Sequence, residues 1–168
     1  MCNKVNVYIY MAPNIFNLNN AVHREKMAGF DYDWTLVKPK DGKIFPDDID
    51  DWMWLHSNIP EKIRKYYDDG YMIVIFTTQA RLWKHDQIKI VASILNIPIF
   101  IVIATDAVIC KPNISFFNSL VENNKINKEE SFFVGDALGR KDDFADFDKG
   151  FAENIGISWH SPESIFDN

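Results

Sequence analysis

The chain alternates short apolar runs with amphipathic segments, and this alternation is the feature that most narrows the folds open to it. The apolar runs are rich in β-branched and aromatic residues, as buried strands are; they are 26–30, 71–77, 98–104, 131–134 and 155–159. Between them, segments 60–69, 86–95 and 114–124 place apolar residues at helical spacing. The sequence therefore predicts an α/β fold, a Rossmann-like parallel sheet with helices on both faces.

Two further segments complete the predicted architecture. Asp41-Gly42 separates 36–40 from 43–45, which is a short-range hairpin signal and predicts a small flap around 38–45, without a large cap domain. Segment 5–11 has the pattern of a strand, so residues 1–25 are expected to form an N-terminal strand extension at the sheet edge. No repeat or linker divides the chain, and we expect 1–168 to form a single domain.

Charge and composition exclude several functions. The formal net charge of −6 argues against a broad basic surface for gripping duplex DNA, although a small local patch could still bind a nucleic-acid end. Cys2 and Cys110 fit neither a zinc site nor a disulfide framework. No apolar run reaches membrane-spanning length and no signal segment is recognisable, so we expect a soluble intracellular protein, nuclear or cytoplasmic, without membrane partners.

Two carboxylates follow the first predicted strand. Asp31 and Asp33 lie two residues apart, so in an extended segment they would face the same side. Two nearby carboxylates repel one another, and Mg²⁺ is a natural counter-ion because it prefers carboxylate oxygen. Taken alone, the pair could equally be two solvated turn residues.

Polar residues also follow the other predicted strands. Thr77-Thr78-Gln79 could hold a phosphate, and Lys111-Pro112 could fix a positive charge beside it. Gly135-Asp136, with Asp143 in the acidic loop behind it, offers a second source of carboxylates. Each signal alone is ordinary for a turn or a surface loop. Their order, each at the carboxyl end of a predicted strand, is more specific, because ligands of parallel sheets bind at that edge.

The ordered set resembles the haloacid dehalogenase superfamily of phosphatases, and more closely the 3′-phosphatase domain of polynucleotide kinase/phosphatases and their stand-alone relatives. The resemblance covers about Lys26 to the C-terminus. It rests on KMAGFDYDWTL, GKIFP, GYMIVIFTTQ, Lys111-Pro112, FVGDALGR, Asp143-Phe144, FAENIG and Ser161-Pro162-Glu163. The stretches FVGDALGR and FAENIG are specific to the subfamily.

The resemblance implies a reaction and a role for each site residue. Asp31 would attack phosphorus to form an aspartyl-phosphate, and Asp33 would protonate the leaving 3′ oxygen and then activate water. Mg²⁺ would be held by the Asp31 carboxylate, the Asp33 backbone carbonyl and Asp136, with Asp143 behind them. Thr77 and Lys111 would position and neutralise the phosphate. The expected substrate-binding residues are Thr35, Thr78, Gln79, Lys84 and Arg140.

Several positions depart from the pattern of the resembled relatives. Trp34 stands where many have Gly, Thr78 where Asn is usual, and Cys110 where many have Arg. No G-x-x-x-x-G-K-[ST] loop occurs, so we expect no kinase domain in this chain. Among the aromatic residues Trp83 is the best placed to stack on a terminal base, although packing is the commoner use of such a residue.

The sequence therefore predicts a polynucleotide 3′-phosphatase of DNA end repair, acting on a nucleic-acid 3′ end, with DNA favoured over RNA and a monomer favoured. Two alternatives stay open. One is a phosphatase of the same superfamily acting on a small phosphorylated metabolite; the other is a non-catalytic module that binds strand ends. The phosphatase prediction requires Asp136 to lie near Asp31 and Asp33, so that a metal site can form between them.

Overall fold

The computed structural model describes residues 12–105, 111–121 and 125–167. A six-stranded sheet runs through it in the order β1-β6-β5-β2-β7-β8. The strands are β1 (Asn14–Leu18), β2 (Met27–Phe30), β5 (Met72–Thr78), β6 (Ile99–Ala104), β7 (Phe132–Val134) and β8 (Ser158–His160). All neighbours pair in parallel except β1, which lies antiparallel to β6 at the edge.

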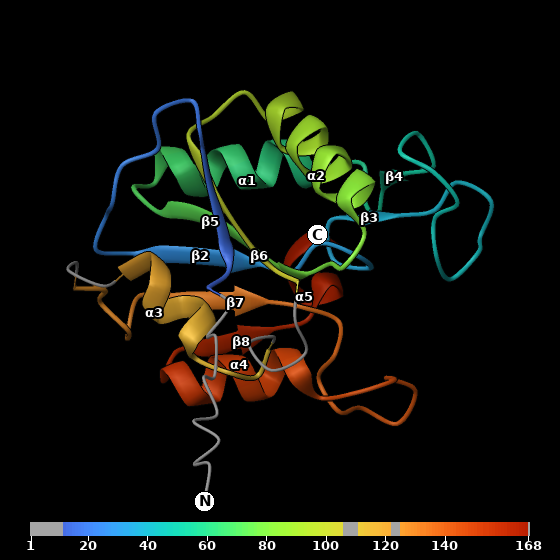
Figure 1. The fold of residues 1–168 in the computed structure, drawn as a ribbon. Coiled ribbons are helices and arrows are strands. Elements are labelled where there is room, and N and C mark those ends of the chain that lie inside the picture. Colours follow the sequence, from blue (N-terminus) through green and yellow to red (C-terminus); the bar gives the residue numbers. More distant parts are fainter. Residues whose placement is uncertain (1–11, 106–110, 122–124, 168) are drawn as a thin grey trace, which may run out of the picture.

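Helices cover both faces of the sheet. They are α1 (Ile59–Asp68), α2 (Leu82–Ile94), α3 (Ser115–Val121), α4 (Phe147–Ile155) and α5 (Pro162–Phe166). Figure 1 shows α1 and α2 above the sheet and α3 and α4 below it. Each face has its own apolar cluster, one containing Ile63, Ile88 and Phe166, the other Phe116 and Phe151. This arrangement confirms the predicted α/β class.

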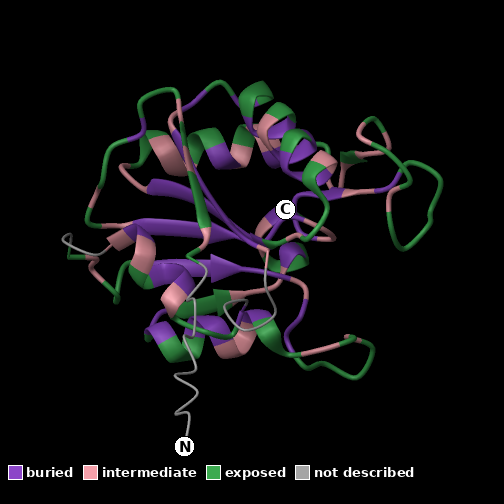
Figure 2. Ribbon diagram, viewed as in Figure 1, coloured by how far each residue is buried: buried purple, intermediate pink, exposed green. Residues whose placement is uncertain are grey.

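The central strands are buried on both faces, which explains their continuous apolar runs. Six of the seven residues of β5 and all six of β6 are buried, and Figure 2 shows the centre of the sheet in the colour of buried residues. Strands flanked by helices on both sides have no solvent face, so the alternation of apolar and polar residues typical of half-exposed strands is absent.

The predicted hairpin at Asp41-Gly42 is wrong. A two-stranded sheet forms instead between β3 (Val37–Lys38) and β4 (Met53–Trp54), with the loop 39–52 between them. We call the segment 37–54 the flap. Residues 43–45 form no strand, because side chains from outside the loop hold its backbone: Trp34 Nε1 donates to the Ile44 carbonyl at 2.9 Å.

The strand β1, Asn14–Leu18, lies within residues 1–25, where a strand extension at the sheet edge was expected. The strand β4 and the helix α4 were not expected, and other elements differ in extent. The helix α4 contains Gly150, where an added Cβ would lie 3.2 Å from Pro112. The helix expected over 86–95 begins at Leu82, and the final strand expected over 155–159 is β8. The strand expected over 5–11 and the end of the helix over 114–124 lie outside the described residues.

Within the described residues, no insertion other than the flap interrupts the alternation of strands and helices. The predicted absence of a large cap domain therefore holds for this part of the chain. No helix in the same part is long and apolar enough to cross a membrane.

Candidate active site

The carboxyl ends of four neighbouring strands bring the expected site residues to one edge of the sheet. Phe30, the last residue of β2, pairs with Ile75 on one side and Val134 on the other. Asp31 follows directly, and its backbone N–H donates to the Val134 carbonyl at 2.9 Å. In Figure 1 the strands point toward this edge, where the flap and the loop between β7 and α4 project on either side.

Three carboxylates form the centre of the site. One oxygen from each of Asp31, Asp136 and Asp148 lies within 4.8 Å of the others. Lys111, from the loop before α3, joins two of them: its Nζ donates to Asp31 Oδ1 at 2.6 Å and to Asp148 Oδ1 at 2.5 Å. The side chains of Lys111 and Asp148 are buried. We call these four residues the acidic cluster.

The local backbone explains how Asp148 reaches the cluster. It lies in the first turn of α4, and its Oδ2 accepts the backbone N–H of Ala137 at 3.0 Å. A Cβ added at Gly135 would lie 2.4 Å from the Asp148 carboxyl group. Glycine at 135 is therefore required for α4 to approach the end of β7 so closely.

The charges in the acidic cluster are not balanced. Burial, together with the charges of Asp148 and Asp136, outweighs Lys111 and raises the pKa of Asp31 well above its usual range. Burial and the charge of Asp148 raise the pKa of Asp136 to about 6. Burial opposes the charge of Lys111, but attraction to Asp148 and Asp31 outweighs it and raises the pKa of the ammonium group. One buried cation thus faces three carboxylates.

The donor set fits a hard divalent cation. All three acidic side chains offer oxygen atoms, and no histidine or cysteine belongs to the group of metal-ligating side chains found among the described residues. Carboxylate oxygens are the ligands that Mg²⁺ prefers, and such an ion would supply the positive charge that the cluster lacks.

Asp33 lies in different surroundings, on the side of β5 and α2. Its Oδ2 accepts from Gln79 Nε2 at 2.6 Å, and its Oδ1 accepts from Lys84 Nζ at 2.7 Å. Gln79 also donates to Thr77 Oγ1 at 3.3 Å, and the buried ring of His85 donates from Nε2 to the Gln79 carbonyl at 2.8 Å. The loop after β5 therefore holds the Asp33 carboxylate with two donors.

The other expected site residues fall into three groups. Thr77 and Thr78 end β5 at the same sheet edge, the first buried and the second exposed. Thr35 is fully buried, and its hydroxyl has no hydrogen-bond partner in the described part of the chain. Lys84 is buried against Asp33 instead of lying on the surface. Their roles toward a substrate stay predictions.

Arg140 and Asp143 bind each other in the loop after β7. Asp143 Oδ2 accepts the backbone N–H groups of Leu138 and Arg140, each at 3.0 Å, and the Arg140 side chain at 2.9 Å. Arg140 also pairs with Glu163. The pKa of Asp143 is lowered chiefly by the Arg140 guanidinium. Asp143 thus shapes the loop, and it does not belong to the group formed by Asp31, Asp136 and Asp148.

Asp148 is the site residue that sequence reasoning missed. It is one of several acids in the segment 142–148. One local signal was available: Phe147 and Phe151 have helical spacing, and Asp148 lies between them, in the first turn of α4.

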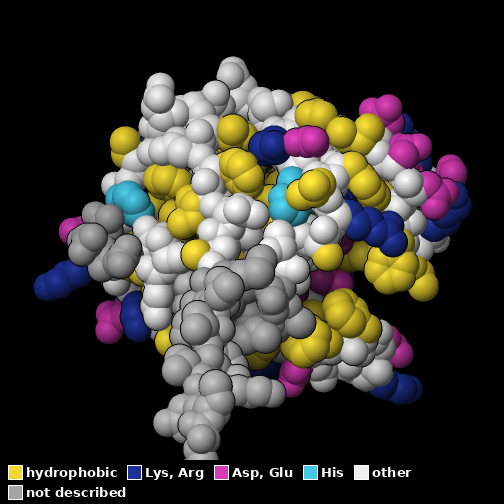
Figure 3. All heavy atoms as spheres, viewed as in Figure 1, with side chains coloured by type: hydrophobic (Ala, Val, Ile, Leu, Met, Phe, Trp, Pro, Cys, Tyr) yellow, Lys and Arg dark blue, Asp and Glu magenta, His cyan; other side chains and the backbone are white. Residues whose placement is uncertain are grey.

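Aromatic side chains surround the site but serve the fold at several positions. Trp52 and Trp54 pack edge to face with ring centres 5.5 Å apart. Trp34 has a left-handed backbone, φ 56°, a conformation that favours glycine. In this conformation the Trp34 indole N–H donates a hydrogen bond to the Ile44 carbonyl in the flap. Figure 3 shows hydrophobic side chains on both sides of the recess between the flap and the β7–α4 loop, where Phe45 and Phe144 are strongly exposed.

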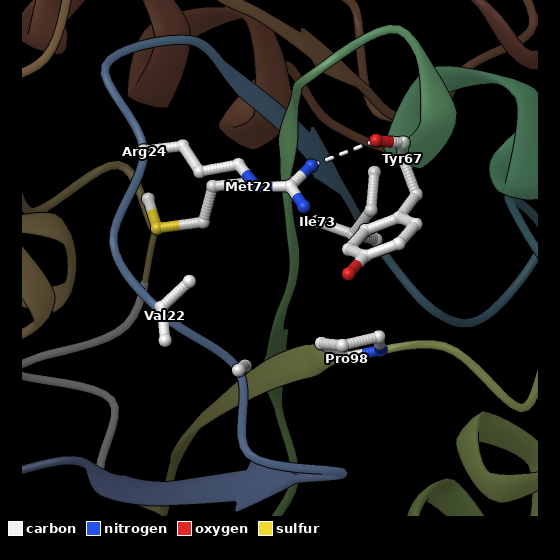
Figure 4. A pocket seen from close by; sticks show the side chains of 7 residues that line it. Val22, Arg24, Tyr67, Met72, Ile73 and Pro98 are labelled. Carbon is white, nitrogen blue, oxygen red and sulfur yellow. Dashed lines mark hydrogen bonds between the residues drawn. The ribbon is translucent and has the colours of Figure 1, made fainter.

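A small apolar pocket lies at the opposite edge of the sheet, near the amino ends of β5 and β6. It is lined by Ala21, Val22, Arg24, Tyr67, Met72, Ile73 and Pro98. Figure 4 shows Arg24 reaching across it, and Arg24 Nη1 donates to the Tyr67 carbonyl at 2.7 Å. The guanidinium also lies 4.2 Å from the centre of the Tyr67 ring. These contacts fasten the segment before β2 to α1, and the pocket lacks the carboxylates of the site.

Comparison with known proteins agrees with this geometry. Residues 26–166 match the family model described as polynucleotide kinase 3 phosphatase. A bifunctional polynucleotide phosphatase/kinase of Schizosaccharomyces pombe is 34% identical over 154 residues, covering 84% of this chain and 38% of that protein. Polynucleotide 3′-phosphatase ZDP of Arabidopsis thaliana is 31% identical over 169 residues, covering 84% of this chain and 24% of that protein. The chain thus spans well under half of either relative.

A solved structure shows the same fold. The D,D-heptose 1.7-bisphosphate phosphatase from B. bronchiseptica, complexed with magnesium and phosphate, aligns with a TM-score of 0.58 at 18% identity, over 80% of this chain and 78% of that chain. The family match spans most of the described residues, including Asp31, Lys111, Asp136 and Asp148. The chain therefore belongs to the polynucleotide kinase 3 phosphatase family, with the fold of haloacid dehalogenase-like phosphatases.

Proposed function

We propose that the chain is a magnesium-dependent polynucleotide 3′-phosphatase, which converts the 3′-terminal phosphate of a nucleic-acid strand break to a 3′-hydroxyl in DNA end repair. The observation that carries the proposal is the acidic cluster: Asp31 at the carboxyl edge of the sheet, beside Lys111 and Asp136, within the residues that match the family. The names of the relatives from S. pombe and A. thaliana support the substrate class.

Asp31 acts as the nucleophile in this proposal. One of its carboxylate oxygens attacks phosphorus, the bond from phosphorus to the 3′ oxygen breaks, and an aspartyl-phosphate forms. A lysine beside the attacking carboxylate favours its ionised form and attracts the phosphate dianion, so Lys111 serves both groups. Asp148 holds Lys111 from the other side and keeps its ammonium group in line with Asp31.

Asp33 moves the proton. In the first step it donates a proton to the leaving 3′ oxygen, so that an alcohol departs instead of an alkoxide. In the second step the same carboxylate accepts a proton from the water that attacks the aspartyl-phosphate, which frees Asp31 and returns Asp33 to its protonated form. The side chain of Asp33 is 33% exposed, so it can reach both the leaving group and water.

Mg²⁺ would be held by the carboxylates of Asp31 and Asp136 and by the backbone carbonyl of Asp33. When bound, it supplies positive charge that offsets the three carboxylates and the phosphate oxygens. Asp143 would act from a distance, by shaping the loop that carries Asp136. Thr77 and Thr78 would bind the phosphate in this proposal, which their position at the end of the neighbouring strand supports.

The openness of the site favours the end of a polymer as substrate. The flap and the β7–α4 loop flank the sheet edge, and no large domain covers it in the described part of the chain. The exposed ring of Phe45 offers a surface on which an unpaired base could stack. With a net charge of −6, binding would depend on such local contacts and not on a broad basic face.

The main alternative is a phosphatase of small metabolites. The structural neighbour from B. bronchiseptica is named a heptose bisphosphate phosphatase and has the same fold, so the metabolite class remains an alternative. A non-catalytic module that binds strand ends is the second alternative. The acidic cluster counts against it, because three clustered carboxylates beside a bound phosphate would hinder simple binding.

The test is phosphate release from a 3′-phosphorylated oligonucleotide, compared with the same oligonucleotide phosphorylated at its 5′ end and with a panel of sugar phosphates. We expect the 3′ substrate to be preferred and the Asp31→Asn variant to be inactive on all of them. The matched control is Asp68→Asn, which removes an exposed carboxylate from α1 at the far edge of the sheet. Preference for the sugar phosphates would overturn the proposal in favour of the metabolite class.

A further inference from the structure

The proposed reaction leaves one buried charge of the site without a role. Lys84 lies in the first turn of α2, and its side chain is only 4% exposed. A buried ammonium group carries a large desolvation cost unless it is paired and hydrogen-bonded. The burial of Lys84 therefore needs an explanation, whereas a lysine exposed to solvent would need none.

The contacts of Lys84 direct its ammonium group toward Asp33. Its Nζ donates to Asp33 Oδ1 at 2.7 Å and to Gln87 Oε1 at 2.8 Å, and it lies 5.0 Å from the centre of the Tyr32 ring. Asp33 is the only carboxylate with which Lys84 forms an ion pair in the described part of the chain. The compensation for burying this charge is thus concentrated on one acidic side chain.

Gln87 fixes the direction of Lys84. It is fully buried on α2, and its Nε2 donates to the flap carbonyls of Asp48 at 3.2 Å and Ile49 at 3.0 Å. With its amide nitrogen committed to the flap, its oxygen faces Lys84 and also accepts from the Tyr32 hydroxyl at 3.2 Å. The flap, Gln87, Lys84 and Asp33 therefore form one continuous chain of hydrogen bonds.

We propose that Lys84 is a positioning residue for the proton-transfer step: it fixes the orientation of the Asp33 carboxylate, and Gln87 fixes Lys84. The inference rests on the proposed function, in which Asp33 is the general acid and base. Gln79 holds the second oxygen of Asp33 at 2.6 Å, so the carboxylate is located by a donor on each side.

A positioning role for Asp33 has a signature that a structural role lacks. Breaking the bond from phosphorus to a 3′ oxygen needs a proton from Asp33, because an alkoxide is a poor leaving group. Breaking the bond to p-nitrophenol needs none, because p-nitrophenolate is stable as an anion. The second step, attack of water on the aspartyl-phosphate, needs Asp33 as a base with either substrate.

The experiment compares first-turnover rates of wild type and Lys84→Met on a 3′-phosphorylated oligonucleotide, phenyl phosphate and p-nitrophenyl phosphate. We expect Lys84→Met to lose about 100-fold or more on the first two, the range typical of general acid–base catalysis. The burst of p-nitrophenol should stay within about threefold of wild type. Phosphate should then accumulate on the protein, which intact-mass spectrometry after an acid quench would detect.

Two further variants keep the test decisive. Gln87→Met keeps the ammonium group of Lys84 but removes the hydrogen bond that orients it, so it should show the same selective loss to a smaller degree. This variant can be measured even if Lys84→Met does not fold. Lys89→Met removes a lysine from the same helix that pairs with Asp86 outside the site, and should leave all three rates unchanged. Equal losses on all three substrates, or no loss on any, would show that Lys84 serves only the fold and would overturn the inference.

The two proposals fail in different ways. If wild type cleaves the aryl phosphates but not the oligonucleotide, the proposed substrate is wrong. The ratio between phenyl and p-nitrophenyl phosphate then still decides the role of Lys84, since it does not depend on the natural substrate. If the oligonucleotide is cleaved and that ratio is the same in the variants and in wild type, the proposed function stands and the positioning role is overturned.

Discussion

Asp31 and Asp33 each accept a hydrogen bond from a buried lysine, but the two pairs lie in opposite surroundings. The lysine of Asp31, Lys111, is shared with Asp148, and Asp136 lies beside them, so this side of the site has an excess of negative charge. The lysine of Asp33, Lys84, has Asp33 as its only ion-pair partner in the described residues, with neutral Gln79 and Gln87 completing the network.

The difference separates two tasks within one short motif. An excess of carboxylates favours a bound cation, and that cation is what the side of Asp31 requires to offset its own charge and that of a phosphate. A balanced and hydrogen-bonded pair holds a carboxylate still without a metal, as the side of Asp33 requires. The two sides also come from different parts of the chain, the loops after β6 and β7 for Asp31 and the loop after β5 with α2 for Asp33.

The largest expected effect is on the formation of the phosphorylated protein. Asp31→Asn should lower turnover by about 10³-fold or more, because no nucleophile remains. Asp33→Asn should also stop turnover of an alkyl phosphate, but with p-nitrophenyl phosphate it should still give one burst of p-nitrophenol and retain phosphate. Rapid-quench kinetics distinguish the two variants. Metal-dependent activity of normal size in Asp31→Asn would contradict the assignment of the nucleophile.

The next effect concerns the metal. EDTA should abolish activity and Mg²⁺ should restore it. At about 100 times its Kd, Mg²⁺ should stabilise the protein by about 2.7 kcal/mol, which raises the melting temperature by about 5–10 °C. Asp136→Asn should lose most of this shift, whereas Lys84→Met should keep it. Differential scanning fluorimetry with and without Mg²⁺ measures both.

Asp142→Asn, an exposed change in the same loop, is the control for the metal experiment. If Asp136→Asn kept the full shift with Mg²⁺, or if activity were indifferent to chelation, the acidic cluster would not be the metal site.

Stability should also distinguish the two aspartates. Asp33→Asn should lower the free energy of unfolding by about 1–2 kcal/mol, because it leaves the buried Lys84 without a carboxylate. Asp31→Asn should be neutral or slightly stabilising without metal, because Lys111 keeps Asp148 and one repelling charge is removed. Urea unfolding in EDTA gives both values. A larger loss for Asp31→Asn would reverse the comparison.

The smallest expected effect is the pH dependence of the metal-free protein. The pKa of Asp136 is raised to about 6 in the folded chain, so the folded state holds a proton that the unfolded state has released. Stability should therefore fall as pH rises from about 4 to about 6. At pH 7.5 the free energy of unfolding of Asp136→Asn should exceed that of wild type by about 1 kcal/mol or less, because the site is partly solvated. Melting curves in EDTA should show that the difference in stability between Asp136→Asn and wild type disappears toward pH 4. A difference that stays constant with pH would exclude protonation of Asp136 as its cause.

The sequence predicted the sheet and the edge at which the site lies, because both follow from local patterns. Apolar runs identified the central strands, and the acids at the ends of two strands, Asp31 and Asp136, meet because parallel strands end at the same edge. The helix before β5 was also predicted from a local pattern, over 60–69, and α1 spans Ile59–Asp68.

The remaining features depend on contacts between distant residues. Asp148 is 37 residues from Lys111 in the chain, and its burial follows from the packing of α4 against Gly135. The predicted hairpin at Asp41-Gly42 was wrong although this dipeptide is typical of turns. Side chains outside the loop, Trp34 and Gln87, donate hydrogen bonds to its backbone carbonyls instead. Lys84 was expected to bind substrate, and its ion pair with Asp33 could not be predicted because only the folded chain brings the two residues together.

The central claim is that Asp31 forms the covalent bond while Asp33 moves the proton, and locating the phosphate on the protein tests it most directly. Wild type and Asp33→Asn would be mixed with p-nitrophenyl phosphate and Mg²⁺, quenched in acid, digested and mapped by mass spectrometry. We expect the phosphate on Asp31 in both, in larger amount in Asp33→Asn. Phosphate on another residue, or a burst of p-nitrophenol that leaves no phosphate on the protein, would contradict the claim.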